Sequence, residues 1–236
     1  MINYIINIDG ILEKFLVAFA LVFAIIIAIG FHEAAHGYAA YKCGDMTAKL
    51  SGRLTLNPFK HFDVFGILMF LIVGIGWAKP VPINPGNFKN YKKGMFLVSI
   101  AGVTVNLILT FLFAGLLSLL LFIIGVCGGI VSANFVYYLV YFFEQFLLVS
   151  IILNISLIAF NLLPIYPLDG FRIVESLTRY DNPYCVFMRR YGIYVLLGFL
   201  IIGTFVPYLD IVSRFIDLIR TAILKLLGIV FKLNFI

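Results

Sequence analysis

Charged residues are scarce in this sequence of 236 residues. Aspartate, glutamate, lysine and arginine make up 12% of it and hydrophobic residues 63%, whereas about 25% of an ordinary soluble domain is charged. This composition excludes such a domain and predicts a polytopic protein of the lipid bilayer. The net charge of +6 is spread over several short loops, whereas nucleic-acid binding needs a concentrated basic face. We therefore expect no nucleic-acid partner.

Cysteine is also rare. Cys43, Cys127 and Cys185 form no Cys-x-x-Cys pair, and an odd, scattered set argues against a disulfide framework. The first 14 residues contain Asp9 and Glu13 and lack the basic n-region of a signal peptide. We therefore expect the first apolar run to be retained.

Long apolar runs dominate the chain instead. A helix needs about 20 apolar residues to cross the hydrocarbon core. The candidate spans are about 15–41, 94–125, 135–163 and 191–206, with a turn at 127–134 inside the uncharged stretch 94–143. We predict an all-α polytopic membrane protein with four to five membrane-spanning helices. Residues 1–236 are expected to form a single membrane-embedded domain, with a core at about 15–173 and C-terminal helices at about 190–233.

Three other segments predict different structures. Residues 46–58 alternate polar and apolar side chains around Gly52, which favours a short β-hairpin. Residues 64–76 are apolar, too short to cross comfortably and flanked by lysines on both sides, which favours a re-entrant segment. Residues 210–232 carry charges at spacings of three to five beside Ile, Leu and Phe, which predicts an amphipathic interfacial helix.

The basic residues predict the orientation. The loops 42–60, 79–93 and 172–190 hold most of them, whereas 126–136 hold no charge. The positive-inside rule places the first three loops in the cytosol. This arrangement is consistent only if 64–76 is re-entrant, so the two predictions depend on each other.

One motif carries the chemistry. His32-Glu33-Ala34-Ala35-His36 directly follows the uncharged run 15–31. Two histidines four apart on a helix lie about 5–6 Å apart at Cβ, so both can bind one metal ion. Glu33 lies on the adjacent face, where it can take a proton from a metal-bound water. Counted back from Lys42, His36 lies about 9 Å and His32 about 15 Å below the cytosolic surface.

Asp169 is the best candidate for a third ligand. A catalytic zinc ion needs three protein ligands and one open position, so we expect one Zn²⁺ per chain. Pro164 and Pro167 stop a regular helix just before Asp169. Arg172 marks the cytosolic boundary, so Asp169 falls near the depth of His36. Irregular backbone at that depth is tolerated where it lines a cavity.

These stretches resemble the site-2 protease family of intramembrane zinc metalloproteases, in its compact form without an inserted soluble domain. The HExxH stretch and Asn161-Leu162-Leu163-Pro164-Ile165-Tyr166-Pro167-Leu168-Asp169-Gly170 match its two signatures, and 52–58 and 76–85 look similar to further family patterns. The resemblance covers about 15–173. It implies His32, His36 and Asp169 as zinc ligands and Glu33 as general base.

The same resemblance implies substrate-contact residues. It implies that Asn161 and the break at Pro164 and Pro167 help to hold an unwound substrate strand. Residues 101–106 resemble an Ala-Gly-Pro-x-x-Asn pattern in which Asn106 is present and Val103 replaces the proline. The expected activity is endopeptidase cleavage of transmembrane or signal-peptide-like proteins near the cytosolic side of a prokaryotic cell membrane. The segments 46–58 and 77–85 are expected to pair with the exposed substrate backbone.

Several alternatives stay open at this point. His61 is interpreted as a loop histidine. Cys43 is interpreted as a boundary cysteine, because it lies about 10.5 Å along the helix from His36, too far to bind the same zinc. Glu144 is interpreted as an interfacial carboxylate. A metal transporter or zinc scaffold could use the same ligands, but it would not need Glu33 and would need a second polar path. A catalytically dead interaction protein is disfavoured because every ligand and the base are present. The oligomeric state is not predicted.

Overall fold

The computed structural model describes residues 8, 10–57, 60, 63, 65–66, 79–126, 134–179 and 181–233. All regular elements in these ranges are helices, so the prediction of an all-α protein is confirmed. Four of the described helices are long and apolar enough to cross a membrane, at the lower end of the predicted four to five. They are α2 (Ile11–Cys43), α5 (Tyr91–Val126), α6 (Asn134–Asn161) and α8 (Pro183–Phe205).

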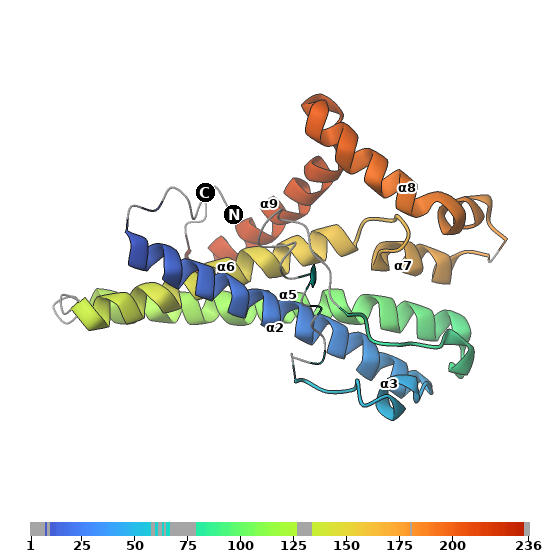
Figure 1. The fold of residues 1–236 in the computed structure, drawn as a ribbon, viewed down its shortest axis with the longest axis horizontal. Helices are drawn as coiled ribbons and strands as arrows, with labels where there is room; N and C mark the ends of the chain where they lie inside the picture. The colour runs from blue at the N-terminus through green and yellow to red at the C-terminus, as the bar shows by residue number, and fades with distance from the viewer. Residues whose placement is uncertain are drawn as a thin grey trace.

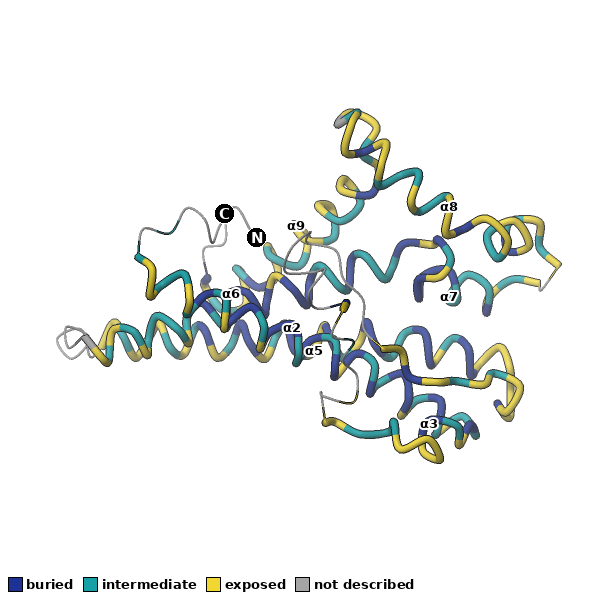
Figure 2. Tube along the Cα trace, viewed as in Figure 1, coloured by how far each residue is buried: buried dark blue, intermediate teal, exposed yellow. Residues whose placement is uncertain are grey.

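The helices α2, α5 and α6 run side by side and form the central bundle (Figure 1). Leu21 and Ile25 of α2 pack against Val149 of α6, and Phe113 of α5 packs in a cluster with Ile151 of α6. Small α2 residues with no exposed surface include Ala20, Ala24 and Ala28. Small side chains let helix backbones approach closely in a membrane, and the buried residues concentrate where the three helices meet (Figure 2).

Only one of the two described C-terminal helices packs along this bundle (Figure 1). The helix α8 projects away from it, and α9 (Ile211–Phe231) returns to it (Figure 1). The amphipathic helix predicted at 210–232 is therefore present as a helix. Its Leu227 is fully buried in the cluster that includes Leu117 of α5 and Ile151 of α6, so part of its apolar surface packs on protein. A short 3₁₀ turn, η4 (Pro207–Leu209), joins α8 to α9.

The predicted β-hairpin at 46–58 is wrong. The segment begins with a short helix, α3 (Thr47–Leu50), and continues in turns, with no strand among its described residues. The carboxylate of Asp45 accepts hydrogen bonds from the backbone N–H and the hydroxyl of Thr47, which starts a helical turn, as short polar side chains do. The backbone N–H groups of Arg53 and Leu54 then both donate to the Ala48 carbonyl. The alternating pattern therefore reflects turn chemistry and not a sheet face.

Two other predictions lie largely outside the described residues. The predicted re-entrant segment 64–76 is described only at Phe65 and Gly66, and the predicted turn at 127–134 only at Asn134, where α6 begins. His61 lies outside them too. These interpretations stay predictions.

Asp45 connects the end of α2 to the segment before α5. Its side chain is fully buried and accepts hydrogen bonds from Asn84 N at 2.7 Å and Asn87 Nδ2 at 2.8 Å. Between them lies η2 (Pro85–Asn87). Burial raises the pKa of Asp45, but the hydrogen bonds from Thr47, Asn87 and Asn84 outweigh burial and lower this pKa below its ordinary value. Gly44 ends α2 with a left-handed φ of 112°.

Replacement of Asp45 by alanine should destabilise the fold. The change removes the acceptor of four partly buried hydrogen bonds from Thr47, Asn84 and Asn87, so we expect it to lower the free energy of unfolding by about 1–3 kcal/mol. The measurement is thermal unfolding in detergent. The matched control is Asp217→Ala, because Asp217 forms an exposed ion pair with Arg220 and should change stability by less than about 0.5 kcal/mol. Equal stability of the two variants would contradict the role of Asp45.

Candidate metal centre

The helix α2 presents two imidazoles on one face, as the four-residue spacing predicts. The ring centroids of His32 and His36 lie 4.6 Å apart, and their Nε2 atoms lie 3.0 Å apart. Both residues are buried, at 6% and 5% exposure. Two ligand nitrogens therefore face one point inside the bundle.

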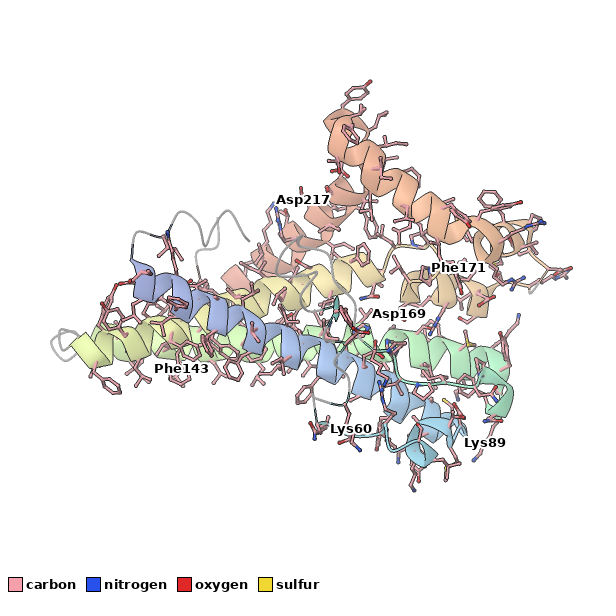
Figure 3. All side chains as sticks on the ribbon, viewed as in Figure 1. Lys60, Lys89, Phe143, Asp169, Phe171 and Asp217 are labelled. Carbon is pink, nitrogen blue, oxygen red and sulfur yellow. The ribbon has the colours of Figure 1, made fainter. Side chains whose placement is uncertain are left out.

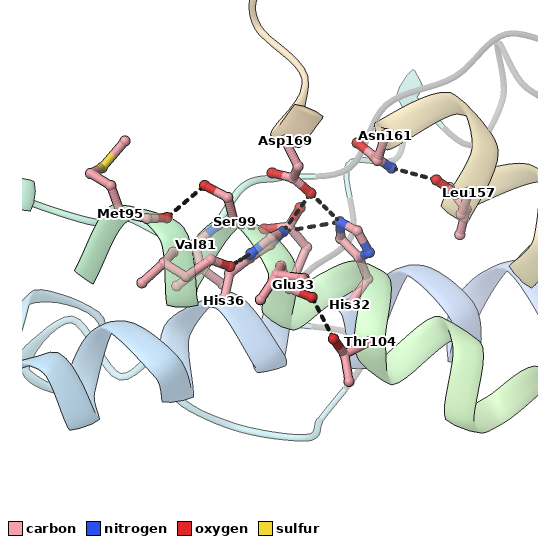
Figure 4. Close-up of polar contacts among 12 residues, drawn as sticks. His32, Glu33, His36, Val81, Met95, Ser99, Thr104, Leu157, Asn161 and Asp169 are labelled. Carbon is pink, nitrogen blue, oxygen red and sulfur yellow. Dashed lines mark hydrogen bonds and ion pairs between the residues drawn. The ribbon is translucent and has the colours of Figure 1, made fainter. Parts of the chain in front are cut away.

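Asp169 approaches the same point from a distant part of the chain. The helix α6 ends at Asn161, residues 162–168 form turns, and α7 (Asp169–Leu177) begins at Asp169 itself. The prediction that Pro164 and Pro167 interrupt the helix is confirmed. Asp169 Oδ2 lies 3.3 Å from His32 Nε2 and 3.2 Å from His36 Nε2 (Figure 4).

The start of α7 is held in place by close backbone packing. A Cβ atom at Gly170 would lie 2.3 Å from the Leu162 carbonyl oxygen, so only glycine allows α7 to approach the turn this closely. The helix α8 holds the turn at 162–168 in place, because the Tyr184 hydroxyl donates a hydrogen bond to the Pro164 carbonyl. Phe171 is 1% exposed, and its ring contacts the ring of Tyr184. In Figure 3, Asp169 lies between α7 and the bundle.

The helix α5 orients both histidines. His36 Nδ1 lies 2.7 Å from the Val98 carbonyl oxygen, which can only accept, so this nitrogen carries the proton and leaves the Nε2 lone pair free for a metal. The ring of His32 lies against Gly102, where a Cβ atom would be 2.5 Å from His32 Cε1 and 2.7 Å from Nε2. Gly102 therefore makes the space that the second imidazole occupies.

The three side chains fit a zinc ion. Their ligand atoms all lie within 4.8 Å of one another, and all three residues are buried. Asp169 Oδ2 makes no aligned hydrogen bond although both Nε2 atoms are near, as expected for atoms directed at a common ion. Two imidazoles and one carboxylate match the three protein ligands of a catalytic zinc site.

A cavity of about 660 Å³ opens beside these three residues. Glu33 lines it, and its Oε2 accepts a hydrogen bond of 2.9 Å from the backbone N–H of Val81. Val81 belongs to the segment 79–84, which has no regular secondary structure and can lie against α2 because Gly37 lacks a side chain: a Cβ atom there would be 3.0 Å from Val81 Cγ1. Nothing in the sequence signals the contact between Glu33 and Val81, since it joins a side chain to a backbone group 48 residues away.

The predicted substrate residues fall in different places. Asn161 and Pro167 line the cavity, whereas its described wall includes neither Pro164 nor Asn106. Asn161 Nδ2 donates to the Leu157 carbonyl at 3.0 Å. Asn106 has no exposed surface, and neither its Nδ2 nor its Oδ1 has a hydrogen-bond partner in the described chain.

Sequence reasoning missed two charged residues of the cavity wall, Arg172 and Glu175. They follow Asp169 by three and six residues on α7, so helical periodicity could have found them once α7 was predicted to begin at Asp169. Cys43 is not in the described metal-binding group, which contains only the two histidines and Asp169. Its interpretation as a residue outside the metal shell agrees with this geometry.

Comparison with known proteins identifies the family. A sequence model of peptidase family M50 matches residues 18–203, which is most of the chain. The chain belongs to peptidase family M50, the site-2 proteases. A relative from Bacillus subtilis (strain 168), named "Putative zinc metalloprotease YwhC", is 48% identical over 157 residues, covering 66% of this chain and 68% of the relative. No solved structure gives a significant match.

Family membership confirms the resemblance drawn from the motifs. This M50 peptidase is a metalloprotease, and its metal is zinc. The four long apolar helices among its described residues fit a multi-pass protein of a prokaryotic membrane.

Replacement of Gly102 by alanine should weaken zinc binding. The new methyl group would overlap the His32 ring, so the imidazole must move away from the common point. We expect zinc affinity to fall about 10–100-fold, as it does when groups that orient a metal ligand are disturbed. The measurement is a zinc competition titration against a chelating dye.

The control lies on the same helix. A Cβ atom at Gly125 of α5 would meet nothing within 4 Å, so Gly125→Ala should bind zinc like the wild type. If Gly102→Ala also keeps full zinc affinity, the metal does not depend on the position of His32.

Proposed function

We propose that this M50 peptidase hydrolyses peptide bonds within transmembrane or signal-peptide-like segments, near the cytosolic face of a prokaryotic cell membrane. The observation that carries the proposal is one cavity that holds a buried His-His-Asp cluster beside a carboxylate. Peptide hydrolysis needs an activated water and a group that takes its proton. Both requirements can be met inside this cavity.

We assign His32, His36 and Asp169 as the ligands of one zinc ion per chain, with the fourth position left for water. When bound there, zinc lowers the pKa of its water toward about 7 and polarises the substrate carbonyl. The role of α2 is to hold two neutral imidazoles with their Nε2 atoms directed inward. The role of α7 is to add the carboxylate, which balances part of the positive charge in a medium of low dielectric.

Glu33 is proposed as the general base. It follows a ligand directly in sequence and lines the same cavity, so its carboxylate can take a proton from the attacking water and pass it to the leaving amine. The Val81 N–H holds Oε2 in place, which leaves Oε1 for the water. This hydrogen bond also connects Glu33 to the segment 79–84.

A substrate helix must unwind before attack, because its amide groups are otherwise bonded within the helix. The cavity supports binding of such a strand, since Asn161 and Pro167 line it on one side and Pro80 and Val81 on the other. We propose Asn161 and Pro167 as substrate contacts and Pro164 as a residue that shapes the turn. The full burial of Asn106 supports a role within the bundle. Because the described residues 46–57 form no strand, the segment 79–84 is the candidate for pairing with the substrate backbone.

The positions of the basic loops support a cytosolic active site. The C-terminal end of α2, the helix α3, the start of α5 and α7 all lie at one end of the bundle (Figure 1). Lys42, Lys49 and Lys89 belong to the chain segments at this end, and Lys89 is seen near α3 in Figure 3. The positive-inside rule then assigns this end to the cytosol.

Replacement of Glu33 by glutamine should stop cleavage without removing zinc. The carboxamide keeps the size of the side chain but cannot take a proton. Quantitative proteomics of host membranes should show an uncleaved single-span protein that accumulates with E33Q relative to wild type. With this protein co-reconstituted in liposomes, the cleavage rate should fall about 10²–10⁴-fold, with one zinc per chain retained.

Asp169→Asn is the comparison variant. An amide is a poorer ligand than a carboxylate, so this variant should lose both zinc and cleavage. Cleavage by E33Q at the wild-type rate would reject Glu33 as the base, and stoichiometric zinc in D169N at wild-type affinity would reject Asp169 as a ligand.

A further inference from the structure

Some of the hydrogen-bond donors that line the cavity are already engaged within the protein and are not available to a substrate. The Ser99 hydroxyl donates to the Met95 carbonyl at 2.8 Å, and Asn161 Nδ2 donates to the Leu157 carbonyl at 3.0 Å. Both donors are thus engaged by the backbones of their own helices (Figure 4). A group that must bind a carbonyl oxygen as negative charge develops on it needs a donor that is not already engaged.

Arg172 is such a donor. It lines the cavity and follows Asp169 by three residues on α7, so the two side chains leave the same face of the helix, about 5–6 Å apart at Cβ. Within the described chain its guanidinium forms no hydrogen bond and no ion pair. An arginine stays protonated at any working pH and offers a planar set of N–H donors.

The ion pair between Glu175 and Arg189 leaves Arg172 without a charged partner in the described chain. Glu175 follows it by three residues and would be its natural partner on the helix. Glu175 Oε1 instead lies 2.5 Å from Arg189 Nη1 of α8, and the two side chains are only 10% and 25% exposed. The partner that would neutralise Arg172 is therefore occupied from another helix, and the cavity keeps a positive charge beside the metal site.

We propose that Arg172 is a catalytic residue that donates to the carbonyl oxygen of the scissile peptide bond. This inference rests on the proposed function. When water adds to the carbonyl carbon, the π-electron pair moves to oxygen, and the guanidinium stabilises that oxyanion. The N–H donors of Arg172 stay on the arginine throughout, while Glu33 carries the transferred proton. A fixed donor of this kind is typically worth about 10²–10³-fold in rate.

The test compares a tetrahedral and a planar probe on the zinc-loaded full-length protein in detergent. The first probe is a dansyl-labelled phosphinic peptide, whose anionic tetrahedral phosphorus group mimics the oxyanion. The second is the same peptide with an ordinary amide, and it is titrated in proteins that also carry E33Q, so that it is not cleaved. Fluorescence titration should show that R172Q binds the phosphinic peptide about 10²-fold more weakly than wild type. Affinity for the amide peptide should change less than about threefold, because its carbonyl carries no full charge.

Three variants make the result interpretable. Arg190→Gln removes an exposed arginine of α8 that lies over the Tyr191 ring and should bind both probes like wild type. Arg172→Lys keeps the positive charge but lacks the planar guanidinium, so its affinity for the phosphinic peptide should lie between those of R172Q and wild type. Arg172→Ala should regain phosphinic-peptide binding when guanidinium ion is added, and each variant should retain one zinc per chain.

The outcomes separate this inference from the function on which it rests. If R172Q and wild type bind the phosphinic peptide equally, Arg172 is an interfacial cation and the inference fails while the protease assignment stands. An equal loss of both peptides shows general substrate binding and also overturns it. If zinc-loaded wild type prefers neither probe and E33Q still cleaves, the proposed function itself fails.

Discussion

Two imidazoles and a carboxylate must be held together inside a bundle whose buried side chains are mostly apolar. Each of these groups is costly in a membrane unless it is paired or bound to an ion. Their ligand atoms lie within 4.8 Å of one another, so a single divalent ion can satisfy all three at once. Much of the surrounding structure serves this convergence: Gly102 makes room for one ring, the Val98 carbonyl sets the tautomer of the other, and Gly170 lets α7 approach the turn.

The third ligand depends on the C-terminal helix α8, which has few other contacts with the bundle. The Tyr184 hydroxyl holds the Pro164 carbonyl, and Gly192 packs directly on Tyr166, where a Cβ atom would lie 2.6 Å from the tyrosine Cβ. Arg189 of the same helix binds Glu175 at the cavity wall. The proline-containing turn and the first two turns of α7 are thus fixed from outside the bundle. This arrangement lets an irregular segment present Asp169 at a defined position.

Part of this structure could be predicted from local patterns. Apolar runs of about 20 residues predict the spans, and the first span is predicted to end at about Tyr41, two residues before the end of α2 at Cys43. The four-residue spacing predicts that His32 and His36 share a face. The part played by Asp169 is non-local, and its prediction depended on depth estimates and on resemblance to a family.

The errors and omissions also have physical causes. Residues 46–58 alternate like a strand, but four hydrogen bonds to the Asp45 carboxylate fix a helical turn and anchor it to Asn84 and Asn87. The contact between Glu33 and the Val81 N–H could not be predicted from the sequence, because a backbone group gives no signal in the pattern of side chains. The pairing of Glu175 with Arg189 could not be foreseen either. Arg172 is the nearer partner in sequence, and Arg189 reaches Glu175 only because of the position of α8.

X-ray absorption spectroscopy at the zinc edge tests the central claim most directly, namely that one zinc ion is bound by His32, His36 and Asp169. The wild-type protein should show a four-coordinate site of two imidazole nitrogens and oxygen donors at about 2.0–2.2 Å, with no sulfur. A sulfur shell at about 2.3 Å, or a site with a single imidazole, would contradict this ligand set.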